Sequence, residues 1–145
     1  MQTLDLFRPS VGAFALGMAE AALRIATTRT AFGTPISDFQ GASHQLANVR
    51  VEIEAAKLLV YSAAAAHDNG DTECLNGKAA MAELHATETA RRAVDTAIQV
   101  LGARGLEADS TLAHLYLEVR APRIYQGTSE IQRNIIAREL FNGRL

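Results

Sequence analysis

Hydrophobic residues recur every three or four positions along most of the chain, which is the period of an α-helix. The clearest run extends from Asp38 to Asn69, where charged side chains occupy the face opposite the apolar one. We expect Gly70 to end this helix, because glycine readily adopts the left-handed conformation of a C-terminal cap. The apolar positions are Phe39, Leu46, Val49, Ile53, Ala56, Val60 and Ala63.

Four more segments carry the same helical period. In the first, Val11, Phe14 and Met18 form an apolar stripe that follows a proline suited to an opening helical turn. The second carries a row of alanines that would let a neighbouring helix approach closely, and we expect this row to serve contacts between copies of the chain. The segments are Pro9–Thr28, Leu75–Leu101, Ser110–Ala121 and Ser129–Phe141, and the alanines are Ala82, Ala86, Ala90, Ala93 and Ala97.

Short polar residues mark where these helices should begin. Ser37 or Asp38 can cap the free backbone amides of the second helix. Ser129, followed three residues later by Gln132, has the form of a capping box, and Glu130 places a negative charge where the helix dipole favours it.

Composition supports an all-α fold. Hydrophobic residues make up 48% of the 145 residues, aromatic residues only 6%, and the chain has no tryptophan, which favours close helix packing over a sandwich of sheets. No segment has a convincing strand pattern, and neither a linker nor an internal repeat divides the chain. The sequence therefore predicts one domain, residues 1–145, built as an antiparallel up-down-up-down bundle of three long and two shorter helices.

Charge and cysteine content exclude several functions. The formal net charge of -2 provides no basic field for nucleic acid, and the longest uncharged run, Pro9–Ala19, is too short and too glycine-rich to cross a bilayer. Cys74 is the only cysteine, so no internal disulfide can form and a reducing compartment is expected. We expect a soluble protein of the cytoplasm, or of an organelle matrix if a leader has been removed.

Common catalytic and metal signatures are missing. Glu83 and His85 are two positions apart, so they cannot share one helical face as the ligands of a di-iron bundle do. No glycine-rich phosphate loop follows a strand, and Ser129 lacks the glycines of a hydrolase nucleophile elbow. No metal site is predicted, because the four histidines, His44, His67, His85 and His114, show no ligand spacing.

Three ordered motifs do carry a resemblance. Residues 29–40 read Arg-Thr-Ala-Phe-Gly-Thr-Pro-Ile-Ser-Asp-Phe-Gln, residues 95–105 read Asp-Thr-Ala-Ile-Gln-Val-Leu-Gly-Ala-Arg-Gly, and residues 120–138 contain Ile-Tyr-Gln-Gly-Thr-Ser-Glu-Ile-Gln-Arg. Together they resemble the C-terminal helical domain of the acyl-CoA dehydrogenases, flavoprotein oxidoreductases of fatty acid metabolism. The resemblance covers essentially the whole chain but only the last two fifths of such an enzyme, without its N-terminal helical domain and middle β-barrel.

The resemblance implies FAD as cofactor and an acyl-CoA thioester as substrate. Arg29 and Phe32 would contact the pyrophosphate and adenine side of an FAD held mainly by a neighbouring subunit, so a homo-oligomer (dimer or tetramer) or a partner chain with the missing domains is implied. The chain alone is not expected to bind FAD tightly. The further implied cofactor residues are Gln40, Gln99, Gly102, Thr128, Ser129 and Glu130, and the implied substrate residues are Asp5, Arg8 and Gly127.

The reaction implied is α,β-dehydrogenation, in which a carboxylate removes the α-proton. The family's usual glutamate position is occupied here by Gln126, and the alternative position used by a minority of members by Phe7. Neither an amide nor a phenyl ring can accept this proton. The chain is therefore expected to be the FAD-binding and subunit-contacting domain of such an enzyme, inactive alone. The alternative is a non-catalytic helical interaction or assembly module that has lost the base.

Overall fold

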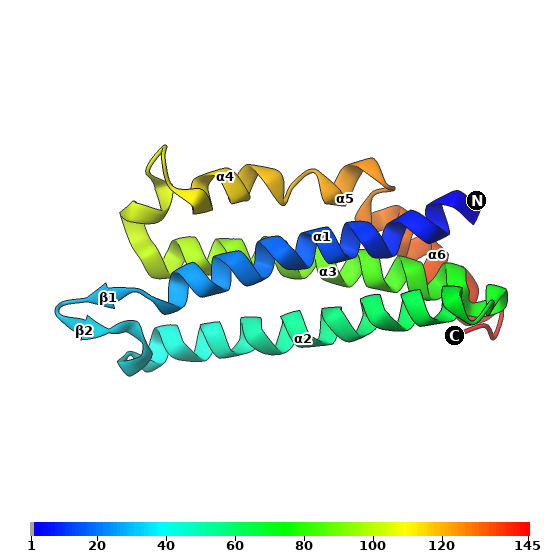
Figure 1. Ribbon diagram of the computed structural model, residues 1–145, viewed down its shortest axis with the longest axis horizontal. Helices are drawn as coiled ribbons and strands as arrows, with labels where there is room; N and C mark the ends of the chain where they lie inside the picture. Colours follow the sequence, from blue (N-terminus) through cyan, green and yellow to red (C-terminus); the bar gives the residue numbers. More distant parts are fainter. Residues whose placement is uncertain (1) are drawn as a thin grey trace.

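Three long helices of alternating direction run side by side, and the shorter helices pack along them (Figure 1). The computed structural model describes residues 2–145. The all-α, up-down-up-down bundle predicted from the sequence is confirmed, with α3 in contact with each of the other helices. The helices are α1 (Gln2–Thr27), α2 (Gln40–Asp68), α3 (Thr72–Leu101), α4 (Thr111–Glu118), α5 (Pro122–Tyr125) and α6 (Ser129–Phe141).

Small side chains form the core between α1 and α3. Alanines from both helices are almost completely buried there, which brings the two backbones close together. The alanine row of α3 is therefore not an exposed contact surface, and its expected role in self-association is wrong. The buried alanines are Ala15, Ala19, Ala22 and Ala26 of α1 and Ala82, Ala86, Ala90, Ala93 and Ala97 of α3.

The first helix begins seven residues before the predicted start. Pro9 lies inside α1 rather than in its first turn, so the carbonyl of Asp5 lacks the usual backbone donor. The helix nevertheless continues, because Asp5, Arg8 and Pro9 are all buried on this side of α1. Phe14 was expected on the apolar stripe but is about half exposed.

A short β-hairpin joins α1 to α2, although the sequence predicted no strand. Strand β1 (Thr30–Ala31) pairs antiparallel with β2 (Thr34–Pro35). The two-residue loop between them is Phe32-Gly33, and both residues have positive φ, 54° and 77°. This backbone is that of a type I′ turn, whose twist matches the twist of the flanking strands.

The ends of α2 differ in how well the sequence predicted them. Gly70 has a φ of 70°, the amide of Gly70 donates to the carbonyl of His67, and the amide of Asp71 donates to the carbonyl of Ala66 at 2.9 Å. These are the two bonds of a Schellman cap, so the predicted C-terminus is confirmed. At the other end, Phe39 is the N-cap and the helix begins one residue later.

Neither Ser37 nor Asp38 caps α2. Both lie in the 3₁₀ turn Ile36–Asp38, where the Ser37 hydroxyl donates to the Asp38 carboxylate at 3.1 Å. By contrast, Ser110 does cap α4, because its hydroxyl accepts from the amide of Leu112. Among residues 2–145, no helix is both long enough and apolar enough to cross a membrane.

Candidate functional site

The residues singled out from the sequence gather at two opposite ends of the bundle. One group lies near the start of α1 and the junction of α5 with α6, and the other lies near the β-hairpin and the end of α3 (Figure 1). We call these the α6 end and the hairpin end. Arg8 and Thr27 are separated by 19 helical residues of α1, which at 1.5 Å per residue places the two ends about 30 Å apart.

At the α6 end, Arg8 occupies a buried position between two carboxylates. It is 3% exposed, and its Nη1 donates to Asp5 Oδ1 at 2.9 Å and to Asn76 Oδ1 at 3.2 Å. Its Nε lies 3.6 Å from Oε2 of Glu83, which is 1% exposed. Burial raises the pKa of Glu83 to about 8, with the charge of Arg8 opposing the shift. Burial also raises the pKa of Asp5 despite Arg8.

Gln132 connects this cluster to the loop before α6. Its Nε2 donates to Glu83 Oε2 at 2.8 Å and lies 3.2 and 3.3 Å from the carbonyl oxygens of Gln126 and Gly127. Gly127 has a φ of 104°, and a Cβ built there would lie 3.1 Å from the same Nε2. Glycine is therefore required at 127 by both backbone conformation and space.

The Gln126 side chain is half-buried, and its Oε1 has no hydrogen-bond partner within the described part of the chain. The neighbouring Tyr125 has a pKa raised by burial and by the nearby Glu83. Phe7, at the alternative base position, is half exposed. The structure therefore places a neutral amide in the loop where the resemblance implies a carboxylate.

The start of α6 differs from the predicted capping box. Thr128 is the N-cap, with no side-chain cap bond, while Ser129 and Gln132 turn into the bundle. The Ser129 hydroxyl donates to Glu88 Oε1 at 2.8 Å, and Arg123 Nη2 reaches the same oxygen at 3.0 Å. Burial would raise the pKa of Glu88, but these two donors lower it overall.

Thr128 makes no side-chain cap bond to the first-turn amides of α6. Ser129 and Gln132 instead donate to the α3 carboxylates Glu88 and Glu83, which are shielded from water and need donors. Glu130 is exposed, as expected of a first-turn acid, and its pKa is lowered by hydrogen bonds from the Thr128 hydroxyl and from its own backbone amide.

At the hairpin end, the implied cofactor residues are largely exposed. Phe32 is 99% exposed at the tip of the hairpin, Gln40 is the first residue of α2, and Gln99 lies in the last turn of α3. Gly102 follows α3 with a φ of 66° and open space around its Cα. Arg29 is partly buried, and its Nε is buried without a partner among the described residues.

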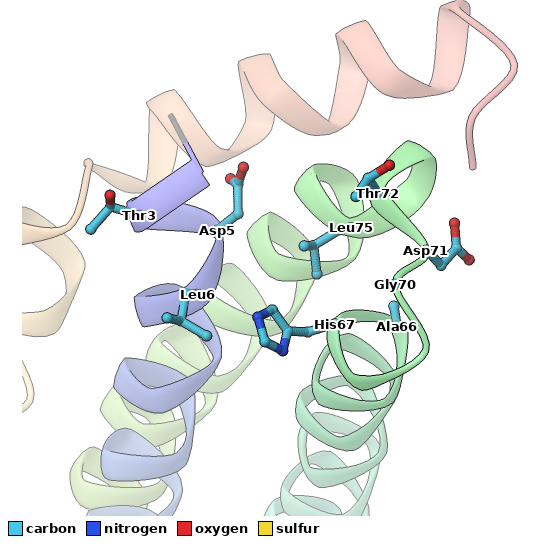
Figure 2. Close-up of a pocket in the computed structure, with 9 residues that line it drawn as sticks. All are labelled: Thr3, Asp5, Leu6, Ala66, His67, Gly70, Asp71, Thr72 and Leu75. Atoms are coloured by element: carbon cyan, nitrogen blue, oxygen red, sulfur yellow. The ribbon is translucent and has the colours of Figure 1, made fainter.

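A hollow of about 490 Å³ lies between the start of α1 and the turn from α2 to α3. Figure 2 shows Leu6 and His67 on opposite walls, with Asp5 above them pointing toward α6. Asp5 is the only implied substrate residue that lines it, because Arg8 and Gly127 do not. The hollow is therefore adjacent to the buried cluster rather than part of the Gln126 loop.

Two buried residues at the α6 end were not predicted as site residues, Glu83 and Gln132. The spacing of the sequence does indicate that Glu83 is buried. It lies four residues after Ala79 and three before Ala86, so it shares the buried alanine face of α3. Among the described residues, no three His, Cys, Asp or Glu side chains come together in a group that could hold a metal ion.

Comparisons with known proteins agree with this geometry. The profile of the acyl-CoA dehydrogenase C-terminal domain matches residues 1–141. The chain is 42% identical to 3-(aryl)acrylate reductase of Clostridium sporogenes and 40% identical to the mitochondrial short-chain specific acyl-CoA dehydrogenase of Bos taurus, over 97% of this chain in both cases. It covers 38% and 34% of these two relatives.

Solved structures give the same result. Butyryl-CoA dehydrogenase from Megasphaera elsdenii superposes with a TM-score of 0.91 at 36% identity, over 97% of this chain and 37% of that one. The chain thus spans little more than a third of the length of the proteins it matches. With its three motifs and its helical bundle, the chain belongs to the acyl-CoA dehydrogenase family and corresponds to the family's C-terminal domain.

Proposed function

We propose that this chain is the helical domain of an FAD-dependent enzyme that acts on the α,β bond of an acyl-CoA thioester. The observation that carries the proposal is the placement of the two residue groups at opposite ends of one rigid helix pair. The α6 end holds the implied substrate residues Asp5, Arg8 and Gly127, and the hairpin end holds the implied dinucleotide residues Arg29 and Phe32.

The resemblance supports an oligomer, because it implies that Arg29 and Phe32 contact an FAD held mainly by a neighbouring subunit. Ser129 contacts Glu88 of α3 and Arg29 lines a hollow with Leu101 of α3, so about 20 Å of helix separates the two implied FAD contact regions. A dimer or a tetramer, or a complex with a partner chain, would supply the neighbouring subunit. We place it in the cytoplasm or an organelle matrix, since a bovine relative is mitochondrial.

The residues present fit FAD. The buried, unpartnered Nε of Arg29 is a donor that a diphosphate oxygen would satisfy, and the exposed Phe32 ring offers a face to an adenine. At the other end, the N-terminus of α6, where Thr128 makes no side-chain cap bond, suits an anionic oxygen. FAD, when bound, supplies the acceptor for the β-hydride. The single chain offers only separate edges of these sites, so we expect it to bind FAD weakly and to be inactive alone.

This chain has no carboxylate at either position that the resemblance implies for the acceptor of the α-proton. Gln126 cannot accept an α-proton, and a reductase working in the opposite direction would need a donor at the same place, which an unprotonated amide does not supply. The Clostridium relative named as a reductase therefore does not remove the difficulty. The residues of the α6 end can therefore bind and orient a substrate but not remove its proton. Asp5 and Glu83 hold Arg8 in position, and Gln132 holds the loop before α6.

The test is assembly with the domains that the resemblance implies. The chain would be co-expressed with the amino-terminal part of a related short-chain enzyme, and the complex examined for flavin absorbance and by light scattering. We expect a yellow oligomer, with little flavin on the chain alone. A colourless mixture of the two parts, or a well-folded monomer that never associates, would contradict the proposal.

A second candidate is a helical assembly module without catalysis. It is favoured by one observation: Gln126 and Phe7 occupy the two base positions that the resemblance implies, so neither position holds a carboxylate. Flavin binding separates the two candidates, because an assembly module does not need Arg29 and Phe32 to bind FAD. An oligomer that binds no flavin, whatever domains are added, would support the module.

A further inference from the structure

A second hollow lies at the hairpin end, between the last turns of α1 and α3. Its volume is about 340 Å³, and it is lined by Ile25, Thr28, Arg29, Thr30, Leu101 and Arg104. Arg29 follows α1 directly, and Arg104 lies in the 3₁₀ turn Gly102–Leu106 that follows α3. The two arginines follow the C-terminal ends of α1 and α3, and both line the same hollow.

Both arginines lack an acidic partner. Most basic residues of the chain lie within 4.0 Å of a carboxylate, but Arg29 and Arg104 form none of these ion pairs in the part of the chain that the structure describes. No aspartate or glutamate lines the hollow. The lining therefore carries two formal positive charges together with the hydroxyls of Thr28 and Thr30.

Two arginines without acidic partners that line one hollow are suited to an anion with several oxygens. A guanidinium presents parallel N–H donors that match two oxygens of one phosphate, and two of them can hold the two phosphates of a diphosphate from different sides. Arg29 is expected here from the family resemblance. Arg104 is not among the residues that the resemblance implies, and only the structure brings it beside Arg29.

We propose that Arg104 is a second anchor for a diphosphate ester in this hollow, acting together with Arg29. The proposal rests on the proposed function for the identity of the ester, an adenosine diphosphate group of FAD. It assigns Arg104 a role in affinity, since one guanidinium alone would hold the diphosphate from one side only. CoA carries the same chemical group, so the experiment must distinguish the two sources.

The first experiment uses the chain as it stands, titrated with inorganic pyrophosphate at low salt and followed by backbone amide NMR shifts. We expect shifts at the residues that line the hollow, reduced by added salt because the charges are near the surface. Arg104→Gln and Arg29→Gln should each weaken binding about tenfold or more, the usual loss for one charge-assisted contact. Arg24→Gln is the matched control, because Arg24 is an exposed, unpaired arginine of α1 outside the hollow.

The second experiment uses the complex with the barrel-containing part and measures bound flavin. We expect Arg104→Gln to lower the flavin content during dialysis, and excess CoA not to displace FAD from the hairpin end. Displacement by CoA would identify CoA as the ligand and overturn the FAD assignment.

The outcomes separate the two proposals. If Arg29→Gln weakens pyrophosphate binding and Arg104→Gln behaves like Arg24→Gln, the role of Arg104 is wrong while the proposed function stands. If pyrophosphate does not bind the wild-type chain at all, the diphosphate site is overturned. If, in addition, Arg29→Gln leaves the flavin content of the complex unchanged, the proposed function fails at this end.

Discussion

The two ends of the bundle differ in whether their charged side chains find partners of opposite charge within the chain. At the α6 end, Arg8, Glu83 and Gln132 are almost completely buried and are joined by hydrogen bonds and an ion pair. The network continues through Asn76 to Glu139, whose carboxylate also accepts from Arg138 and Arg144. The charged side chains of this end are therefore paired within the chain, although Glu83 Oε1, Gln126 Oε1 and Gln132 Oε1 have no hydrogen-bond partner among the described residues.

The hairpin end has the opposite character. Phe32 is fully exposed on a left-handed backbone, and Arg29 and Arg104 have no carboxylate partner among residues 2–145. An exposed aromatic side chain and unpaired guanidinium groups stabilise an isolated domain very little. The difference indicates that the α6 end holds its loop in place by its own contacts, whereas the hairpin end is arranged for another molecule.

The largest expected effect concerns Gln126 at the α6 end, which stands where the resemblance implies a carboxylate. In the complex with the barrel-containing part, Gln126→Glu should raise the rate of acyl-CoA oxidation by about 10² to 10⁴, the usual contribution of a positioned general base. The substitution keeps the length of the side chain and restores a carboxylate. The measurement is the reduction of an artificial electron acceptor by the complex with a saturated acyl-CoA.

Phe7→Glu is the control for Gln126→Glu, because it places a carboxylate at the alternative position on α1. We expect a smaller gain, since the Phe7 side chain is half exposed on the helix surface. A complex that is already fast with Gln126, and is unaffected by the change to glutamate, would show that the proton acceptor lies elsewhere.

The second prediction compares an arginine from each end. Arg8→Met should lower the free energy of unfolding by about 3 kcal/mol, because it removes the buried cation that pairs with Asp5 and donates to Asn76. Arg29→Met should change it by less than about 0.5 kcal/mol, because Arg29 has no acidic partner. Urea unfolding of the two variants gives both values. Equal losses would remove the distinction between the ends.

The third prediction uses the buried carboxylate Glu83. Its pKa is raised from the usual 4.5 to about 8 in the folded chain, so between these two pH values the folded state holds a proton that the unfolded state has lost. Stability from this group is therefore full below about pH 4.5 and decreases as the pH rises toward 8, by about 1 kcal/mol per pH unit. Glu83→Gln should remove this slope and be more stable than the wild type near pH 8.

The difference between variant and wild type is the quantity to measure, because contributions that do not involve Glu83 cancel in it. Glu88→Gln is the matched control on the same helix. The pKa of Glu88 is lowered, so its stabilisation is present above the usual pKa and is lost as the pH falls through the lowered value. Glu88→Gln should therefore be less stable than the wild type from pH 5 to 8, with little slope. A Glu83→Gln curve parallel to the wild type would contradict the raised pKa.

The same contrast explains what the sequence could predict. The buried face of α2 followed from its period, and six of its seven apolar positions are buried, because burial of one helix face depends on local spacing. Gly70 was predicted because its cap is made within the chain segment itself. The bundle order followed from helix count and short connections.

The predictions failed where a distant partner decides the outcome. Ser129 and Gln132 have the spacing of a capping box, but both donate to carboxylates across the bundle, Ser129 to Glu88 and Gln132 to the buried Glu83. The hairpin was missed because its strands have only two residues each, too few for an alternating pattern. The replacement at Gln126 is visible in the sequence alone, whereas the pairing of Arg29 with Arg104 required the fold.

The smallest predicted effect tests the hairpin end directly, at Phe32. A type I′ turn needs positive φ at both central residues, which asparagine tolerates far better than phenylalanine. Phe32→Asn should therefore increase the free energy of unfolding of the isolated chain by about 0.5 to 1 kcal/mol, since the wild-type ring is fully exposed and no packing is lost. Phe141→Asn is the control, because that exposed ring lies on right-handed backbone at the end of α6 and should give no such gain.

In the complex, Phe32→Asn should lower the flavin content, because the ring is lost as a surface for the adenine. A variant that is both more stable alone and poorer in flavin would show that Phe32 is kept for binding at the expense of the fold. If Phe32→Asn is instead less stable, the ring makes contacts within the domain and the hairpin end is not the unsatisfied surface that the comparison of the two ends indicates.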